Sequence, residues 1–268
     1  MLISYSELCL IGGAVESNIE ALVGAGAEGV ELMLDGAGWN RFDERMEELS
    51  GRLNALGASY SVHVPVWEAN LTSECAHIRD AVAESYRRSI EFAAMVHSRY
   101  VVVHPGWCSN AFFDKAVARS RSREALLSLA EFNGSYGMPL LVENVGGPAA
   151  SLFDEEQYAG FLEGFPPEVG YIVDVGHAHM NGWDIGRLLP SLGARLHALH
   201  LHDNDGHGDA HAPLGEGSVD WRGVCAAALG TGRDLSLVLE LNIGTSVSRL
   251  TESKAFLRRT LAEAAGPL

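Results

Sequence analysis

Seven short apolar runs of this chain each end in a carboxylate or an imidazole. The end residues are Glu31, His63, His104, Glu143, Asp174, His200 and Glu240. Glu31 and Glu240 are 209 residues apart in six steps, about 35 residues per step, which is the length of one strand–helix unit. Because the carboxyl ends of parallel strands lie at one end of a sheet, the repeat predicts that these side chains converge on one place.

Strand-like runs alternate with helix-like runs along the whole sequence. The predicted strands cover residues 2–10, 29–34, 59–66, 100–104, 139–143, 170–175, 196–202 and 236–241. The predicted helices cover residues 16–26, 41–56, 74–97, 114–133, 154–163, 184–192, 220–229 and 248–264. Continuously apolar strands that alternate with helices are typical of a parallel sheet. Eight such units in 268 residues predict an α/β fold, a single (β/α)8 TIM barrel that forms one domain over residues 1–268.

One segment, 203–219, has no periodic pattern and is too long for a plain connection. We expect it to be a functional loop. The rest of the sequence has no low-complexity linker and no shift in composition, so nothing in it indicates a second domain.

The chain is strongly acidic. Its formal net charge is −16, and its only lysines are Lys115 and Lys254. Such a surface repels phosphate backbones and anionic lipids, so we expect binding to nucleic acid or to membranes to be disfavoured. Lys115 forms a basic cluster with Arg119, Arg121 and Arg123, which we interpret as a solvated helix face.

The cysteines and the first residues of the sequence indicate the cellular compartment in which the protein is expected. The four cysteines form no CxxC pair, and the opening MLISYSELCLIGG lacks the charged start of a signal peptide. No apolar run approaches the roughly 18 residues of a membrane span. We therefore expect a cytoplasmic protein with free thiols.

Glu143, Asp174, His200 and Glu240 end four consecutive predicted strands. Three carboxylates brought close together repel one another unless a cation lies between them. Oxygen and nitrogen donors suit a divalent metal ion, and the imidazole favours Zn²⁺ or Mn²⁺. Each residue alone could simply cap the next helix, but the four together predict a metal site.

Further candidate ligands lie beside these four. His63 and His104 end the two preceding strands and are followed by proline in HVP and HPG, which stops the strand and exposes the ring at the barrel mouth. They could hold a second metal ion or be structural. His177 in DVGHAHMNG, and Asp209 and His211 in DAHAPLGEG, are expected on loops. They could clasp an ion, or they could bind substrate or form hydrogen bonds.

Candidate substrate-binding residues follow the same strands. Trp67, Trp107 and Trp183 each come after a ligand motif and could stack on a sugar ring or only pack in loops. His202 points to the same side of its strand as His200 and is expected to face the substrate or to support a ligand. Glu31 could orient a substrate hydroxyl or simply brace the end of its strand, and we favour the former. The predicted loops show no arginine suited to a phosphate, which favours an unphosphorylated substrate, and Gly215-x-Gly217 is interpreted as a turn.

These motifs together resemble the xylose isomerase-like TIM-barrel superfamily, which groups sugar phosphate isomerases and epimerases with endonuclease IV (AP endonuclease family 2). The resemblance covers nearly the full length. The motifs that carry it are HVP (63–65), HPG (104–106), ENVGG (143–147), DVGHAH (174–179), HLHDND (200–205), DAHAPLGEG (209–217) and LELN (239–242).

The resemblance implies a set of metal ligands. Glu143, Asp174, His200 and Glu240 match the metal site that epimerases and isomerases share. The extra zinc ligands of endonuclease IV-like members match His63 and His104 for one ion, and His177, Asp209 and His211 for another. The resemblance therefore implies one shared site and up to three ions. The start LISYSELCL lacks the His-Val-Ser that is typical of endonuclease IV.

We therefore expect a metal-dependent isomerase or epimerase of a small sugar, keto-sugar or polyol derivative. Proton transfer would run through a metal-stabilised enediolate, with Glu143 and Glu240 as the catalytic carboxylates. A hydride shift needs a lysine near the substrate, and neither Lys115 nor Lys254 is suitably placed. The alternatives are a zinc phosphodiesterase like endonuclease IV and a lyase like inosose dehydratase. A homo-oligomer is left open.

Overall fold

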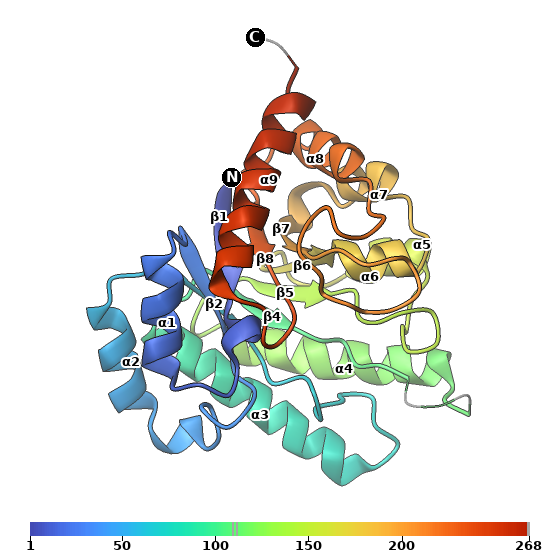
Figure 1. The fold of residues 1–268 in the computed structure, drawn as a ribbon. Coiled ribbons are helices and arrows are strands. Elements are labelled where there is room, and N and C mark those ends of the chain that lie inside the picture. The colour runs from blue at the N-terminus through green and yellow to red at the C-terminus, as the bar shows by residue number, and fades with distance from the viewer. Residues whose placement is uncertain (109, 111, 267–268) are drawn as a thin grey trace.

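A computed structural model describes residues 1–108, 110 and 112–266 of the chain. Its eight strands form a closed barrel in which each strand pairs in parallel with the next and β8 pairs with β1 (Figure 1). The strands are β1 (Leu2–Ser6), β2 (Gly29–Met33), β3 (Tyr60–His63), β4 (Val101–Val103), β5 (Leu140–Glu143), β6 (Val169–Asp174), β7 (Leu196–Leu201) and β8 (Ser236–Leu239). The predicted (β/α)8 TIM barrel is confirmed.

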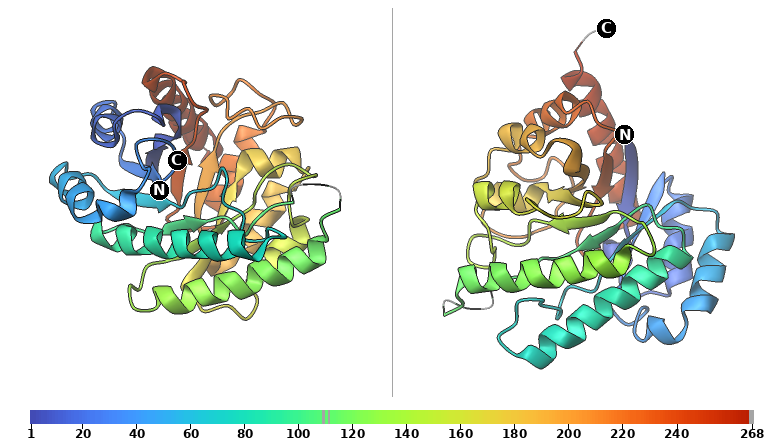
Figure 2. Two further views of the ribbon diagram at one scale, coloured as in Figure 1. Left: turned by 90° about the horizontal axis from the view of Figure 1, so that it is seen from below. Right: turned by 180° about the vertical axis from the view of Figure 1, so that it is seen from behind.

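Helices surround the strands on the outside of the barrel (Figure 2). They are α1 (Val15–Gly24), α2 (Met46–Ala55), α3 (Ala76–Met95), α4 (Lys115–Asn133), α5 (Glu155–Gly160), α6 (Val175–Met180), α7 (Ile185–Ser191), α8 (Trp221–Gly230) and α9 (Val247–Ala264). Short 3₁₀ turns cover Glu7–Leu10, Phe42–Glu44 and Gly193–Arg195. None of the helices in the described ranges combines the length and the apolar character that crossing a bilayer requires.

The inside of the barrel explains where the functional side chains lie. Tyr100, Val102, Leu141, Ile172 and Ala198 form a small buried cluster that is separate from the main core. Because side chains of a strand alternate between its two faces, residues two positions further along point to the same interior. From Val102, Leu141, Ile172 and Ala198, that step leads to His104, Glu143, Asp174 and His200. The apolar cluster thus lies directly below these four residues in the barrel interior and supports them.

Three elements differ from the sequence-based expectation. The first strand ends at Ser6 rather than near residue 10, because the Ser6 hydroxyl accepts a hydrogen bond from Leu8 N and starts a 3₁₀ turn. The predicted helix 41–56 is divided at Arg45, where the backbone φ is −129°. Helix α6 was expected to be a loop. It forms because the Asp174 side chain caps it by accepting from His177 N at 2.6 Å.

The basic residues are mostly used to hold elements together. Lys254 donates to Gly26 O and pairs with Glu28, which fastens α9 to the start of β2. In α4, Arg119 donates to Leu152 O at 2.7 Å and Arg123 to Phe161 O at 3.0 Å. These contacts fix α4 against the following segments, so its basic cluster is engaged within the chain.

Candidate metal centre and active site

Four side chains from β5 to β8 meet inside the barrel mouth. Glu143, Asp174, His200 and Glu240 each offer one ligand atom, and these atoms all lie within 4.8 Å of one another. His200 Nδ1 lies 3.2 Å from Glu143 Oε1, 3.5 Å from Glu240 Oε2 and 4.0 Å from Asp174 Oδ2. All four residues are buried. The structure thus brings together the four residues that the sequence places at consecutive strand ends.

Glu143 joins this group to a second one. Its Oε2 atom lies 3.1 Å from His63 Nε2 and 3.1 Å from His104 Nε2. Both imidazoles are buried and their rings meet edge to face, with centroids 5.0 Å apart. One carboxylate therefore has its two oxygens directed at two different clusters of nitrogen and oxygen donors.

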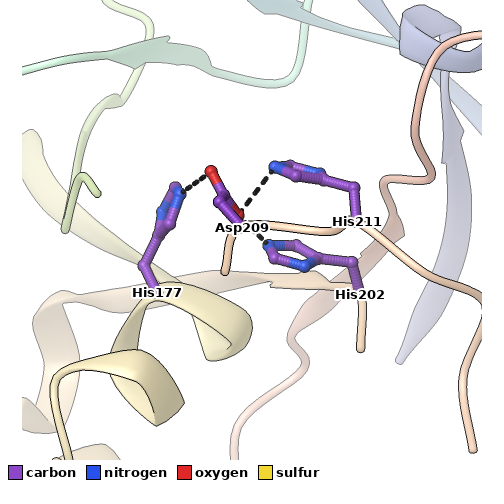
Figure 3. A group of neighbouring side chains, drawn as sticks. All are labelled: His177, His202, Asp209 and His211. Atoms are coloured by element: carbon purple, nitrogen blue, oxygen red, sulfur yellow. Dashed lines mark hydrogen bonds and ion pairs between the residues drawn. The ribbon is translucent and has the colours of Figure 1, made fainter. Parts of the chain in front are cut away.

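A third group lies on the side of α6 and of the loop after β7. Asp209 lies between His177 on one side and His202 and His211 on the other (Figure 3). Its Oδ2 is 3.1 Å from His177 Nε2, and its Oδ1 is 3.3 Å from His211 Nε2. His211 has a left-handed backbone with φ 43°, uncommon for a residue with a side chain, which turns its ring back toward Asp209.

Backbone carbonyls fix which nitrogen of three of these rings faces the carboxylates. The Nδ1 atoms of His63, His177 and His211 lie 2.8, 3.0 and 3.0 Å from the carbonyl oxygens of Val64, Asn144 and Glu240. A carbonyl only accepts, so each Nδ1 carries a proton. Each Nε2 then directs either a second proton or a lone pair at an anionic oxygen. A lone pair there is favourable only if a cation lies between the two groups.

The pKa values show how strongly the carboxylates attract positive charge. Burial alone would lower the pKa of His63, but the hydrogen bond to Glu143 and its charge outweigh burial and raise that pKa to about 9. Burial is likewise outweighed at His177, whose pKa rises to about 10 beside Asp174 and Asp209. At His211, Asp209 raises the pKa to about 9 against the effect of burial. Protons that are held this firmly occupy places that a divalent cation fits, because ligand protons and metal ions compete.

A cavity of about 310 Å³ opens over the three groups. Trp67 and Trp107 lie on its wall, as the sequence predicts. Of the central four residues, only Glu143 and Glu240 line it. The candidate ligands of the two other groups that line it are His63, His104, His177, Asp209 and His211. Donors for metal ions and space for a small molecule therefore occur at the same place.

Three predicted substrate-binding residues do not line this cavity. Glu31 lies one layer deeper: β2 continues to Met33, which is in register with His63, while Glu31 is in register with Ser61. His202 is buried and directs Nε2 at both oxygens of Asp174, 3.1 Å from each. Neither side chain thus lies on the wall of the cavity. His202 contacts Asp174, in keeping with the second of its two expected roles, and Glu31 contacts His200 instead of facing the cavity.

The third of these residues is Trp183. Its ring packs on Tyr158, with centroids 5.4 Å apart, and it lines a separate hollow together with His179. The path of the chain explains this, because α6 intervenes between Asp174 and Trp183 and carries the indole to the outer side of the barrel wall. Trp183 has a packing role, which was the alternative interpretation of the sequence.

Sequence reasoning missed Asp203, which organises the loop after β7. Its Oδ1 accepts from the backbone N–H of Asn204 and Val219, and its Oδ2 from Gly215 N and from Trp221 Nε1, both at 2.8 Å. The side chain is completely buried. The loop lies against α6 (Figure 1), to which Ser218 Oγ is joined by a 2.8 Å hydrogen bond with His179. The only signal in the sequence was the run HLHDND, where Asp203 is one acidic residue among several.

Two glycines of the motifs are explained by close approach. A Cβ on Gly217 would lie 2.2 Å from Asn204 O and 2.3 Å from Asp203 Oδ1. A Cβ on Gly176 would lie 2.0 Å from His202 Cε1. All three distances are shorter than any real contact, so glycine lets the loop pack onto Asp203 and Asn204 and lets α6 pack onto His202. The turn that the sequence predicts at Gly215 is present, with φ +88°.

Comparison with known proteins places this barrel in a family. A family model described as "Xylose isomerase-like TIM barrel" matches residues 19–260. The chain belongs to this family. Among relatives, "Uncharacterized protein MJ1614" of Methanocaldococcus jannaschii is 27% identical over 167 residues, which are 60% of this chain and 62% of that protein. The chain thus spans less than two thirds of that relative's length.

Other proteins to which the chain is similar carry different descriptions. "Probable endonuclease 4" of Natronomonas pharaonis is 25% identical over 173 residues, 59% of this chain and 60% of that protein. The crystal structure of a "D-tagatose 3-epimerase-like protein" has a TM-score of 0.86, 22% identity and coverage of 99% and 98% of the two chains. The structure of "IOLI protein with a binding zinc atom" has a TM-score of 0.79, 16% identity and coverage of 98% of each chain. These two likenesses show a shared fold.

Proposed function

We propose that the protein is a divalent-metal-dependent isomerase or epimerase of a small carbohydrate or carbohydrate derivative. The observation that carries the proposal is that, of the four central candidate ligands, Glu143 and Glu240 alone line the cavity. Two carboxylates beside a bound molecule can remove a proton from one position and return it at another. The description of a structural neighbour as D-tagatose 3-epimerase-like supports the same chemistry.

The two carboxylates are held differently. Both oxygens of Glu143 contact imidazoles, Oε1 that of His200 and Oε2 those of His63 and His104. Glu240 contacts His200 and His211 through Oε2, and its Oε1 has no partner among the described residues. We assign to Glu240 Oε1 the removal of the proton next to a substrate carbonyl. Glu143 returns a proton to the opposite face of the same carbon; it receives this proton at Oε2 from the Nε2–H of His63, and Glu240 releases the proton that it took to solvent.

The donor set fits a divalent ion. Glu143, Asp174, His200 and Glu240 would hold it at the shared site, and the two neighbouring groups offer places for up to two more ions. When bound, such an ion polarises a carbonyl and stabilises the negative charge that develops beside it. We propose Zn²⁺ or Mn²⁺, because imidazole and carboxylate suit both, and a structural neighbour has a bound zinc atom.

Solvent-deuterium exchange tests this function. Protein stripped with a chelator and protein reloaded with Zn²⁺ or Mn²⁺ are incubated in deuterated water with a panel of keto-sugars, and the bound metal is counted by mass spectrometry. We expect deuterium at the carbon next to the carbonyl with loaded protein, and at least about 100-fold slower exchange with stripped protein. Loaded protein that exchanges none of the sugars would contradict the proposal.

A second candidate is a zinc phosphodiesterase that acts at abasic sites in DNA. Three adjacent donor groups that share Glu143 favour it, as does the relative described as probable endonuclease 4. The net charge of −16 weighs against it, since such a surface repels a phosphate backbone. Cleavage of an abasic duplex at nanomolar protein, with two or three bound ions per chain, would rank this activity above the isomerase.

A further inference from the structure

The wall of the cavity divides into two chemical halves. Its polar side chains are the candidate ligands Glu143, Glu240 and the groups beside them. The other lining residues of the described chain are one glycine and residues with apolar side chains. Two of these are tryptophans, whose indole N–H groups are the polar atoms in this half. These apolar side chains belong to Leu8, Met33, Val66, Trp67, Trp107, Val145 and Ala150.

The two halves overlap along the barrel mouth. The ends of β1 and β2 contribute only the apolar residues Leu8 and Met33, and the segments after β6, β7 and β8 contribute only His177, Asp209, His211 and Glu240 to the described wall. Strands β3 to β5 contribute both kinds: His63, His104 and Glu143 lie at the strand ends, and Val66, Trp67, Trp107, Val145 and Ala150 follow in the loops. A molecule in this cavity therefore meets acidic and imidazole groups at the strand ends and on the side of β6 to β8, and hydrocarbon or indole from β1, β2 and the loops after β3 to β5.

A fully hydroxylated sugar fits such a wall poorly. A hydroxyl that is buried against Met33 or Val145 loses its hydrogen bonds to water and gains none. A methyl or methylene group at the same place is favoured by burial. The described lining also contains no lysine or arginine, so a phosphate group would find no guanidinium or ammonium partner there. At about 310 Å³ the cavity is at the small end of the usual range for small-molecule sites.

We propose that the substrate has one chelating polar end and one apolar end, that is, a deoxy- or alkyl-substituted hydroxyketone rather than a fully hydroxylated or phosphorylated sugar. This inference rests on the proposed function. The carbonyl and its neighbouring hydroxyl face Glu143 and Glu240, and the apolar end lies between Trp67 and Val145.

Matched substrate pairs test the inference. The deuterium-exchange kcat/KM of the Zn²⁺-loaded protein is measured for D-fructose against 6-deoxy-D-fructose and for D-tagatose against 6-deoxy-D-tagatose. We expect kcat/KM to be about tenfold or more higher for the deoxy member in at least one pair, because a difference of one group in an apolar pocket changes selectivity by about this factor. Equal rates, or a preference for the parent sugars, overturn the inference and leave the proposed function standing.

If none of these four sugars exchanges, binding decides the inference by itself, while the proposed function fails only if no sugar of the wider panel exchanges. Calorimetry with the same four compounds and the loaded protein should then give tighter binding of the deoxy members. Absence of that preference, including no binding of any compound, overturns the inference.

Variants of the wall give a second readout. Val145→Thr replaces a methyl with a hydroxyl of nearly the same shape, and Ala150→Ser, also on the wall, adds one. Each should shift the preference toward the hydroxylated member by about threefold to tenfold, because the hydroxyl gains a partner. Val117→Thr, on the exposed outer side of α4, is the matched control and should leave the ratio unchanged. An unchanged ratio in both wall variants, with a native circular dichroism spectrum, overturns the inference.

Discussion

Glu31 and His200 are 169 positions apart in the chain, yet Glu31 Oε1 lies 2.8 Å from His200 Nε2 inside the barrel. Both side chains are completely buried, and Glu31 Oε2 also accepts from Ser61 Oγ at 3.0 Å. The contact places the proton of a neutral His200 on Nε2, so Nδ1 faces Glu143 and Glu240 with its lone pair. A carboxylate that the sequence indicated for substrate binding instead orients a ligand.

Glu31→Gln should therefore weaken metal binding without unfolding the protein. Glutamine keeps the shape and can still accept from His200 Nε2, but it removes the negative charge that makes the ring a better donor. We expect a loss of about 10- to 100-fold in Zn²⁺ affinity, measured by competition with a chromophoric chelator. Glu44→Gln on the surface is the control, and equal affinity of the Glu31 variant and the native protein would refute the role.

Glu240→Gln should lower the exchange rate of the loaded protein by about 10²- to 10⁴-fold, since it removes the proposed proton acceptor. Glu143→Gln should have an effect of similar size and should in addition reduce bound metal, because Glu143 contributes to two donor groups. The rates and the metal content are measured on the same preparations, with exposed Glu68→Gln as the control. Retained exchange in both variants would remove the two-carboxylate mechanism.

Asp203→Asn should loosen the loop that carries Asp209 and His211. In the variant, the amide NH2 group would face the N–H groups of Gly215 and Trp221, which now donate to Asp203. These buried donors would then have no acceptor. We expect the free energy of unfolding to fall by about 1–3 kcal/mol in urea titrations, and the ion held by the third donor group to be lost first. Asp205→Asn, exposed in the same loop, is the matched control. A variant as stable as that control would show that the Asp203 contacts contribute little.

Glu7 should make the protein less stable as the pH rises. Burial raises the pKa of Glu7 from 4.5 to about 7, although hydrogen bonds from Asn18 and Trp39 partly oppose this. Between these values the folded protein binds more protons than the unfolded chain, so stability falls from about pH 4.5 to pH 7. One pKa unit corresponds to about 1.4 kcal/mol, which gives about 3 kcal/mol in total.

The measurement is the difference in unfolding free energy between Glu7→Gln and the native protein. Glutamine stays neutral, so this difference should shift by about 3 kcal/mol in favour of the variant between pH 4.5 and pH 8. Exposed Glu20→Gln should show no such trend. A difference that does not change with pH would mean that Glu7 is not titrating in this range.

Much of the site could be predicted because its positions follow local rules. An apolar strand buried on both faces reads as a continuous run, and the first polar residue at its carboxyl end lies at the barrel mouth. This rule correctly located His104, Glu143 and Asp174. It failed at Glu31, because the apolar residue Met33, two positions further along β2, takes the position level with His63 at the barrel mouth.

The eight strand–helix units and the residues that end them follow from the order of the amino acids, since alternation and apolar runs are properties of neighbouring positions. The depth of Glu31, the contact of His202 with Asp174, the position of Trp183 outside the cavity and the geometry with which His177 meets Asp209 follow only from the folded barrel. These depend on the register of strands around a closed barrel and on the path of a loop held by Asp203. Both are fixed by contacts between residues far apart in the chain, which no local pattern records.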